Sequence, residues 1–184
     1  GILEVNNIKS PETTIWFAKN KENLNNNLCK EIKYLVKPIF GSQGKNIFLV
    51  NNLIELKKIK AIGEVFYLQK FIESQEKEFT DVRVLVSNHN VISSMERYSN
   101  HFITNVFQGA KYRQIILGEN IRDLCVKLSK IFKLGYGGID LKITKNDVFV
   151  LEINSIPSWK AMQKISKINI SEKLVNDFIK NVKK

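Results

Sequence analysis

A hydrophobic residue recurs at every second position through residues 139–143 and 149–153, on either side of the turn-forming run 145–147. A period of two predicts two β-strands, and the short turn joins them as a hairpin. In this register the core-facing side carries Ile139, Leu141, Ile143, Phe149, Leu151 and Ile153. On the other side Asp140 lies opposite Glu152, with Asn154 next to it. Directly opposed side chains have Cβ atoms about 5 Å apart, so two like charges there repel and require an explanation.

The remaining patterns predict a mixture of hairpins and helices. Alternating or continuous apolar runs predict strands at 13–16, 34–38, 47–50 and 65–72, and a second hairpin formed by 81–86 and 91–97. Apolar residues at helical spacing predict helices at 21–33, 54–62 and 121–134, and a mostly helical segment at 160–183. Because hairpins alternate with helices, we expect an α+β fold and not a strict series of βαβ units.

Composition narrows the functional classes. The chain has 184 residues, of which 43% are hydrophobic and 26% charged, as in ordinary globular domains. No apolar run approaches the roughly 20 residues of a membrane-spanning helix, and Cys29 and Cys125 fit no metal-ligand spacing. We therefore expect a cytoplasmic protein with reduced thiols. The formal net charge of +11 suggests an anionic partner, but the lysines are dispersed, which makes a basic nucleic-acid-binding module the weaker hypothesis.

A small glycine-flanked loop follows the strand predicted at 34–38. It carries Gly41, Ser42, Gln43 and Gly44, followed by Lys45 and Asn46. A Walker P-loop needs Ser or Thr after its lysine and then a helix, so this loop is not one. Two interpretations remain: a flexible hairpin turn, or a loop that folds down over phosphates and offers them its backbone N–H groups. In the second case Lys37, at the end of the preceding strand, meets the same phosphates.

The facing carboxylates also have two interpretations. They are solvent-side residues with Lys142 as a neighbouring counter-charge, or they bind Mg²⁺ or Mn²⁺ together with the amide oxygen of Asn154. Magnesium prefers oxygen ligands and is usually held by one or two carboxylates plus substrate phosphates. A lysine on a strand, a glycine loop and a downstream Asp, Glu and Asn are together the parts of a nucleoside-triphosphate site. This combination favours the interpretation that Asp140, Glu152 and Asn154 bind a metal ion.

Five segments, in this order, resemble the ATP-grasp carboxylate–amine ligases, particularly the RimK-like glutamate ligases. They are VKPIFGSQG at 36–44, LQKFIE at 68–73, DVRVLV at 81–86, ERYSNHFITNVFQGA at 96–110 and GGIDLKI…VFVLEINSIPSW at 137–159. The resemblance implies an ATP-grasp fold, in which ATP lies between two α+β lobes. We expect these lobes at 1–72, with the glycine loop, and at 73–184, with the metal site.

The resemblance also implies roles for individual residues. The implied nucleotide-binding residues are Lys37, Gly41, Ser42, Gln43, Gly44, Gln69, Lys70, Phe71, Ile72 and Asp81. Arg97 and Asn105 match residues close to the transferring phosphate and the substrate. The implied metal ligands are Asp140, Glu152 and Asn154.

The implied reaction is ATP-dependent amide formation through an acyl phosphate, most simply the addition of glutamate to a small-molecule or peptide carboxylate acceptor. Alternatives are aminoadipate or another acceptor, and a nucleotide-binding protein that has lost catalysis. The sequence is compatible with a monomer and with a homo-oligomer. Compared with the family pattern, we expect the usual N-terminal domain and a further ATP-contacting lysine to be absent from these 184 residues, and Ile103 stands where Arg is frequent. The Trp159-Lys160 ending is similar to that of tetrahydromethanopterin-type glutamate ligases.

Overall fold

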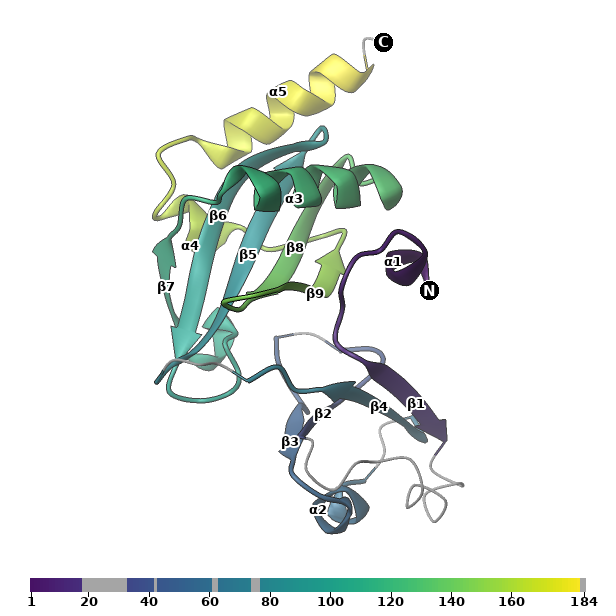
Figure 1. Ribbon diagram of the computed structural model, residues 1–184. Coiled ribbons are helices and arrows are strands. Elements are labelled where there is room, and N and C mark those ends of the chain that lie inside the picture. Colours follow the sequence, from purple (N-terminus) through teal and green to yellow (C-terminus); the bar gives the residue numbers. More distant parts are fainter. Residues whose placement is uncertain (18–32, 42, 61–62, 74–76, 183–184) are drawn as a thin grey trace.

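The computed structural model describes residues 1–17, 33–41, 43–60, 63–73 and 77–182. These residues form two antiparallel sheets, one below the other in Figure 1, which supports the expected α+β class. The smaller sheet has the strand order β1-β4-β2-β3, and the larger has the order β7-β6-β5-β8-β9. The chain passes from the smaller sheet to the larger through residues 71–73 and 77–78, so these residues lie where the two meet.

The smaller sheet consists of β1 (Thr13–Phe17), β2 (Tyr34–Lys37), β3 (Phe48–Val50) and β4 (Val65–Lys70), with the short helix α2 (Leu53–Lys58) packed on it. Asn52 begins α2 by accepting a hydrogen bond from the backbone N–H of Glu55. The apolar side of the sheet and α2 enclose one core, which contains Tyr34, Val36, Val50, Leu56, Phe66 and Leu68. The helix expected at 21–33 lies outside the described residues, apart from Lys33.

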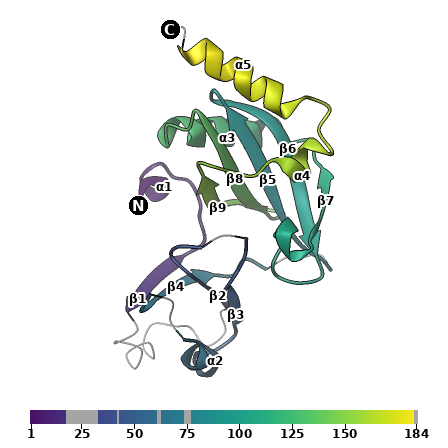
Figure 2. The ribbon, with the colours of Figure 1, turned by 180° about the vertical axis from the view of Figure 1, so that it is seen from behind.

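The larger sheet consists of β5 (Phe79–Ser87), β6 (Asn90–Ser99), β7 (Lys111–Gln114), β8 (Tyr136–Ile143) and β9 (Val148–Asn154). A 3₁₀ turn, η2 (Val106–Gln108), lies between β6 and β7. Helix α3 (Glu119–Ile131) covers one face of this sheet, whereas α4 (Lys160–Gln163) lies on the other face (Figures 1 and 2). Helix α5 (Ile170–Val182) follows α4. The segment predicted at 160–183 is therefore two helices separated by a turn.

The N-terminal residues pack on the larger sheet and not on the smaller one. The short helix α1 (Ile2–Val5), which the sequence pattern did not predict, precedes Ile8, and Ile8 is buried in the same core as Val84 and Ile139. The carbonyl of Lys9 also accepts a hydrogen bond from the N–H of Val150. In the described residues the smaller lobe thus begins at β1.

The β8–β9 hairpin has the predicted pairing of Asp140 with Glu152, but its register shifts between Asp140 and Leu141. This β-bulge places one extra residue on β9. Leu141 consequently pairs with Val150, and Val150 is the residue that is buried in the core. The predicted core positions of Phe149 and Leu151 were therefore wrong: Leu151 instead lines the cleft described below.

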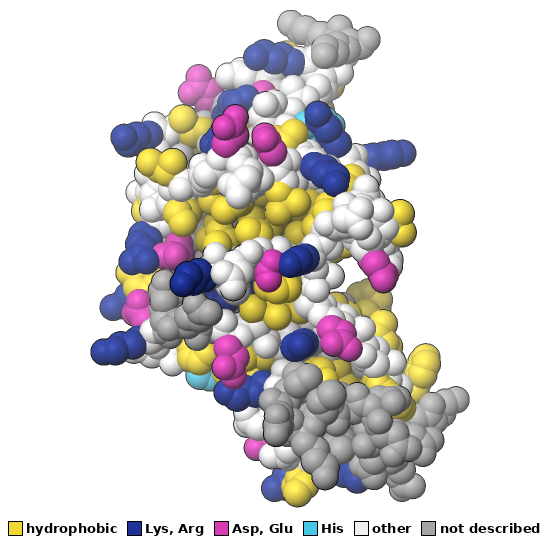
Figure 3. All heavy atoms as spheres, viewed as in Figure 1, with side chains coloured by type: hydrophobic (Ala, Val, Ile, Leu, Met, Phe, Trp, Pro, Cys, Tyr) yellow, Lys and Arg dark blue, Asp and Glu magenta, His cyan; other side chains and the backbone are white. Residues whose placement is uncertain are grey.

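The surface agrees with the dispersed charge of the sequence. On the face shown in Figure 3, Lys and Arg side chains are scattered among acidic side chains and do not gather over one element. No helix in the described part of the chain is both long and apolar enough to cross a membrane.

Candidate active site

A cleft with a cavity volume of about 160 Å³ lies between the two sheets. The smaller lobe contributes residues of β2, β4 and the segment that leaves β4, and the larger lobe contributes residues of β5, β6, β8 and β9. A second compartment adjoins this cleft and extends toward α4. Eight residues line both compartments, so the two spaces are continuous: Lys37, Gly44, Ile47, Arg83, Arg97, Asn105, Leu151 and Glu152.

Lys37 enters the cleft from the end of β2. Its ammonium donates a 2.6 Å hydrogen bond to Oε1 of Gln69, a buried residue of β4. Burial lowers the pKa of Lys37 below its usual value, although Glu152 and Asp140 act in the opposite direction by their negative charges. Lys37 is thus a partly desolvated cation that faces the acidic side chains of the other lobe.

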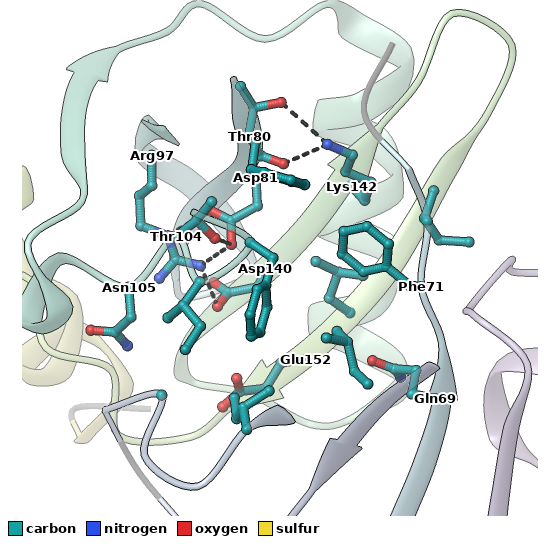
Figure 4. Close-up of a pocket in the computed structure, with 18 of the residues that line it drawn as sticks. Gln69, Phe71, Thr80, Asp81, Arg97, Thr104, Asn105, Asp140, Lys142 and Glu152 are labelled. Atoms are coloured by element: carbon teal, nitrogen blue, oxygen red, sulfur yellow. Dashed lines mark hydrogen bonds and ion pairs between the residues drawn. The ribbon is translucent and has the colours of Figure 1, made fainter. Parts of the chain in front are cut away.

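Asp81 and Arg97 form a buried ion pair on the floor of the cleft (Figure 4). They are cross-strand neighbours on β5 and β6, and the guanidinium of Arg97 donates to both carboxylate oxygens of Asp81 at 2.6 Å. Thr104 donates a third hydrogen bond to Asp81, at 2.7 Å. Because all these donors are directed at Asp81, this carboxylate is built into the wall of the site in a fixed orientation.

Asp140 continues the same network on β8. Arg83, its cross-strand neighbour on β5, donates to both of its carboxylate oxygens, at 2.7 and 2.6 Å, and Arg97 donates to one of them at 2.8 Å. Burial would raise the pKa of Asp140, but Arg97 and Arg83 outweigh burial, and the pKa lies below its usual value. Arg83 and Arg97 are therefore the counter-charges of Asp140. The ammonium of Lys142, the counter-charge considered from the sequence, donates to the carbonyl of Thr80.

Glu152 and Asn154 lie at the edge of the site on β9. Both line the second compartment, and Glu152 also lines the first. Nothing in the described residues hydrogen-bonds the carboxylate of Glu152, and the amide oxygen of Asn154 accepts from the N–H of Ile156. The described part of the chain has no group of three or more His, Cys, Asp or Glu side chains suited to a metal ion. The oxygen donors of Asp140, Glu152 and Asn154 do fit a hard cation in type, provided that Asp140 is released from Arg83.

The glycine loop reaches across the cleft to the other lobe. The carbonyl of Gln43 accepts a 3.1 Å hydrogen bond from the side-chain amide of Gln108, and the ammonium of Lys45 lies 5.7 Å from the ring centre of Phe107. Gly41 is exposed on the same loop, and Ser42 lies outside the described residues. The loop expected to cover phosphates therefore lies over the cleft.

Gly44 shows why this loop needs a glycine. Its φ of +71° is in the left-handed region, and a Cβ there would lie 3.1 Å from Cγ2 of Ile103 and 3.3 Å from Cβ of Asn105. Asn105 itself begins η2, and its side chain accepts a hydrogen bond from the N–H of Phe107. The predicted residue Asn105 is thus held at the point where the loop meets the larger lobe.

The first compartment has an apolar part beside this polar floor. The predicted residues Gln69, Lys70, Phe71 and Ile72 all line it. Other apolar members of the lining come from both lobes: Leu35, Ile47, Phe79, Phe102, Ile103 and Leu151. Flat apolar rings fit between such walls, and the lining also contains the charged residues Lys70 and Lys142.

Sequence reasoning missed Arg83 and Thr104, although both belong to segments that it singled out. Arg83 follows Asp81 by two positions, which places the two side chains on the same face of β5. That spacing was the available signal for Arg83. No comparable pattern pointed to Thr104, whose contact with Asp81 depends on how the loop after β6 folds back.

Comparisons with known proteins agree with this geometry. Residues 1–178 match the model of the RimK-like ATP-grasp domain. The tetrahydromethanopterin:α-L-glutamate ligase of Methanocaldococcus jannaschii is 32% identical over 192 residues, which is 98% of this chain and 64% of that protein. The coenzyme γ-F420-2:α-L-glutamate ligase of the same organism is 28% identical, over 99% of this chain and 64% of that protein. The chain thus spans just under two thirds of the length of these relatives.

Solved structures show the same fold at low sequence identity. The ATP-grasp ligase PsnB, in complex with a minimal precursor, Mg and ADP, matches with a TM-score of 0.72 and 17% identity, over 100% of this chain and 57% of that one. The D-alanine–D-alanine ligase of Bacillus anthracis matches with a TM-score of 0.68 and 14% identity, over 97% of this chain and 64% of that one. Sequence and fold agree, and the chain belongs to the family of RimK-like ATP-grasp domains.

Proposed function

We propose that this chain carries the nucleotide site of an ATP-dependent carboxylate–amine ligase that adds glutamate to a carboxylate acceptor. One observation carries the proposal: Lys37 of the smaller lobe faces Asp140, Arg83, Arg97 and Glu152 of the larger lobe across a single cleft whose lining is partly apolar. A cation, a glycine loop and acidic side chains beside an apolar slot suit a nucleoside triphosphate and its metal. Relatives whose names state glutamate ligation support the choice of amine.

In the proposed complex the adenine lies between the apolar walls near Phe71 and Ile72, and the phosphates extend toward Lys37. The glycine loop covers the phosphates with its backbone N–H groups. Asp81 is already occupied by Arg97 and Thr104, so its contribution is to hold that wall of the site.

Asp140, Glu152 and Asn154 would hold Mg²⁺, or Mn²⁺ in its place. A divalent cation held there would offset the negative charge that develops on the leaving ADP. The structures of PsnB with Mg and ADP or with AMPPNP support a magnesium nucleotide in a cleft of this fold.

The reaction then depends on how the protein positions its substrates and does not require a nucleophile from the protein. The acceptor carboxylate attacks the γ-phosphorus, ADP leaves, and the amine of glutamate displaces phosphate from the acyl phosphate to form an amide. Arg83 and Arg97 supply positive charge beside the transferred group, and the glycine loop keeps water from the acyl phosphate.

The second compartment is the proposed place of both carboxylate-bearing substrates. Arg83 and Arg97 in its lining are already paired with Asp140 and Asp81, so Lys37, Lys45 and Lys160 face a single carboxylate, that of Glu152. Such an excess of positive charge favours di- and tricarboxylate substrates over neutral ones. A small-molecule or peptide acceptor in the cytoplasm, where ATP is available, is consistent with this charge, whereas a nucleic-acid partner has no extended basic surface in Figure 3.

ADP release tests the proposal. The protein at its full natural length is incubated with Mg·ATP, glutamate and a panel of carboxylate acceptors. We expect ADP release that requires both glutamate and one class of acceptor, and that falls at least 100-fold in Glu152→Gln, because one proposed metal ligand is lost. No release above background with any acceptor would overturn the ligase assignment.

A further inference from the structure

Two arginines, Arg83 and Arg97, bind the carboxylate of Asp140. Arg83 approaches it as a fork, with Nε and Nη2 at 2.7 and 2.6 Å from its two oxygens, and Arg97 adds a contact of 2.8 Å to Oδ2. The pair is also nearly buried, since the side chain of Arg83 is 13% exposed and that of Asp140 is 8% exposed. A bidentate, charge-assisted pair shielded from water is among the stronger polar contacts in proteins.

This contact conflicts with metal binding at the same carboxylate. Mg²⁺ requires carboxylate oxygens at about 2.0–2.1 Å in near-octahedral geometry. The fork of Arg83 occupies one lone-pair site on each oxygen of Asp140, and Arg97 occupies the second site on Oδ2, so only one site, on Oδ1, is left. A metal at Asp140 therefore competes with Arg83 for the oxygens of this carboxylate.

The two arginines differ in how easily they can withdraw. Arg97 has a second partner, Asp81, to which it donates twice, and this pair is fixed by Thr104. Arg83 makes its side-chain hydrogen bonds and ion pairs within the described residues only with Asp140. Arg83 also lines both compartments of the cleft, so an anion bound in either one offers it an alternative partner.

We propose that Arg83 is an internal competitor of the metal at Asp140, displaced when a nucleotide phosphate draws the guanidinium away. This inference rests on the proposed nucleotide site. It makes metal and nucleotide binding mutually dependent: the metal binds weakly alone, and each ligand strengthens the other by the same factor. Such coupling keeps the site from holding a metal without its nucleotide.

Mn²⁺ titration without nucleotide tests this directly, with free Mn²⁺ measured by electron paramagnetic resonance. Arg83→Met removes the guanidinium while keeping much of its apolar stem, and we expect it to bind Mn²⁺ at least tenfold more tightly than the unaltered protein. The matched control is Arg113→Met, which removes an arginine of the same sheet paired with Glu96 outside the cleft. We expect this control to leave Mn²⁺ affinity unchanged.

Two additional variants make the result specific. Asp140→Asn added to Arg83→Met must abolish the gain, because the released carboxylate is then absent. Arg83→Lys keeps the charge without the fork, folds with the least disturbance, and should give a smaller gain of about threefold. Unchanged or weaker Mn²⁺ affinity in folded Arg83→Met and Arg83→Lys, checked by circular dichroism, would overturn the inference.

The same titration in the presence of ADP separates this inference from the proposed function. In the unaltered protein ADP should tighten Mn²⁺ binding, and in Arg83→Met this effect should shrink by the factor already gained without ADP. Failure of the ligase assay would leave both titrations interpretable, because neither needs an acceptor or turnover. A full effect of ADP that persists in Arg83→Met would contradict the coupling.

Discussion

The ammonium of Lys37 lies 2.6 Å from Oε1 of Gln69, which joins the end of β2 to the neighbouring strand β4 at the mouth of the cleft. The buried amide thus fixes the position of a cation whose pKa is lowered, chiefly by burial. Lys37→Met should weaken the binding of Mg·ADP at least tenfold, measured by isothermal titration calorimetry, because the phosphates lose this cation. The fold should tolerate the change, since a desolvated charge is removed along with the hydrogen bond.

Lys33→Met is the matched control for Lys37→Met. Lys33 lies just before β2 and pairs with Glu73, but both side chains are well exposed and neither lines the cleft. An exposed ion pair contributes little, so this variant should bind Mg·ADP with unchanged affinity. Equal affinities of the two variants would remove Lys37 from the nucleotide site.

The sequence could predict the pairing of Asp140 with Glu152 because both determinants are local. The turn at 145–147 and the period of two on each side determine which residues face each other. The bulge next to Asp140 could not be predicted in the same way. Val148 and Val150 are as apolar as Phe149 and Leu151, so the pattern of β9 is compatible with either face in the core.

The sequence pattern also could not predict contacts between strands that are distant in the chain. Arg83 meets Asp140 only because β5 and β8 are neighbours in the sheet, which no local pattern states. The repulsion between Asp140 and Glu152 suggested a metal ion from the sequence. In the structure, Arg83 and Arg97 offset the negative charge of Asp140. The sequence pattern also did not predict β7 and α1, which have four residues each.

Asp81 should be essential for stability. Asp81→Ala would leave the guanidinium of Arg97 buried with Asp140 as its remaining anionic partner, and breaking a buried pair typically costs about 3–5 kcal/mol. Urea unfolding followed by circular dichroism measures this cost. Glu96→Ala, which breaks the pair with the exposed side chain of Arg113 on the same sheet, should cost less than about 1 kcal/mol. Similar losses in the two variants would show that burial does not strengthen the Asp81 pair.

Gly138 is required by a close approach to the turn that follows β9. A Cβ at this position would lie 2.7 Å from Cβ of Pro157, and Gly138 pairs with Asn154 across the hairpin. Tyr136 holds the same turn by donating a 2.7 Å hydrogen bond to the carbonyl of Pro157. Gly138→Ala should therefore cost about 1–3 kcal/mol of unfolding free energy, as overpacking does, and should weaken Mn²⁺ binding by moving Asn154.

Gly135→Ala provides the control for Gly138→Ala. An added Cβ at Gly135 meets nothing within 4 Å, so the same chemical change there should leave thermal stability and Mn²⁺ binding nearly unchanged. Comparable destabilisation at both positions would attribute the effect to backbone entropy and not to the contact with Pro157.

Lys160 should select for charged substrates. Lys160 lines the second compartment, to which Lys37 and Lys45 also contribute positive charge. Lys160→Gln should raise KM for glutamate or for the acceptor about tenfold, with kcat and KM for ATP unchanged, because the residue does not line the first compartment. Lys164→Gln, an exposed lysine at the end of α4 outside both compartments, should change none of these constants. A fall in kcat alone would place Lys160 in the chemistry instead.

Asp177 should make stability depend on pH at a point far from the cleft. This buried residue of α5 accepts hydrogen bonds from Ser87 at 2.7 Å and from Lys173 at 2.5 Å. Burial raises its pKa, but these donors and the charges of Lys173 and Lys180 outweigh burial and hold the pKa below its usual value of 3.8. A carboxylate with a lowered pKa stabilises the folded state above its usual pKa, and the contribution is lost as the pH falls through and below that value.

Asp177→Asn should accordingly reduce the free energy of unfolding by about 1–3 kcal/mol near neutral pH, where a hydrogen-bonded charge is replaced by an amide. The difference from the unaltered protein should shrink as the pH is lowered below about 4, because both proteins are then neutral at this position. Urea unfolding at several pH values measures the difference, and Lys173→Met should show a weaker pH dependence of the same sign. A difference that stays constant from pH 7 to pH 3 would mean that Asp177 stabilises the protein by shape and not by charge.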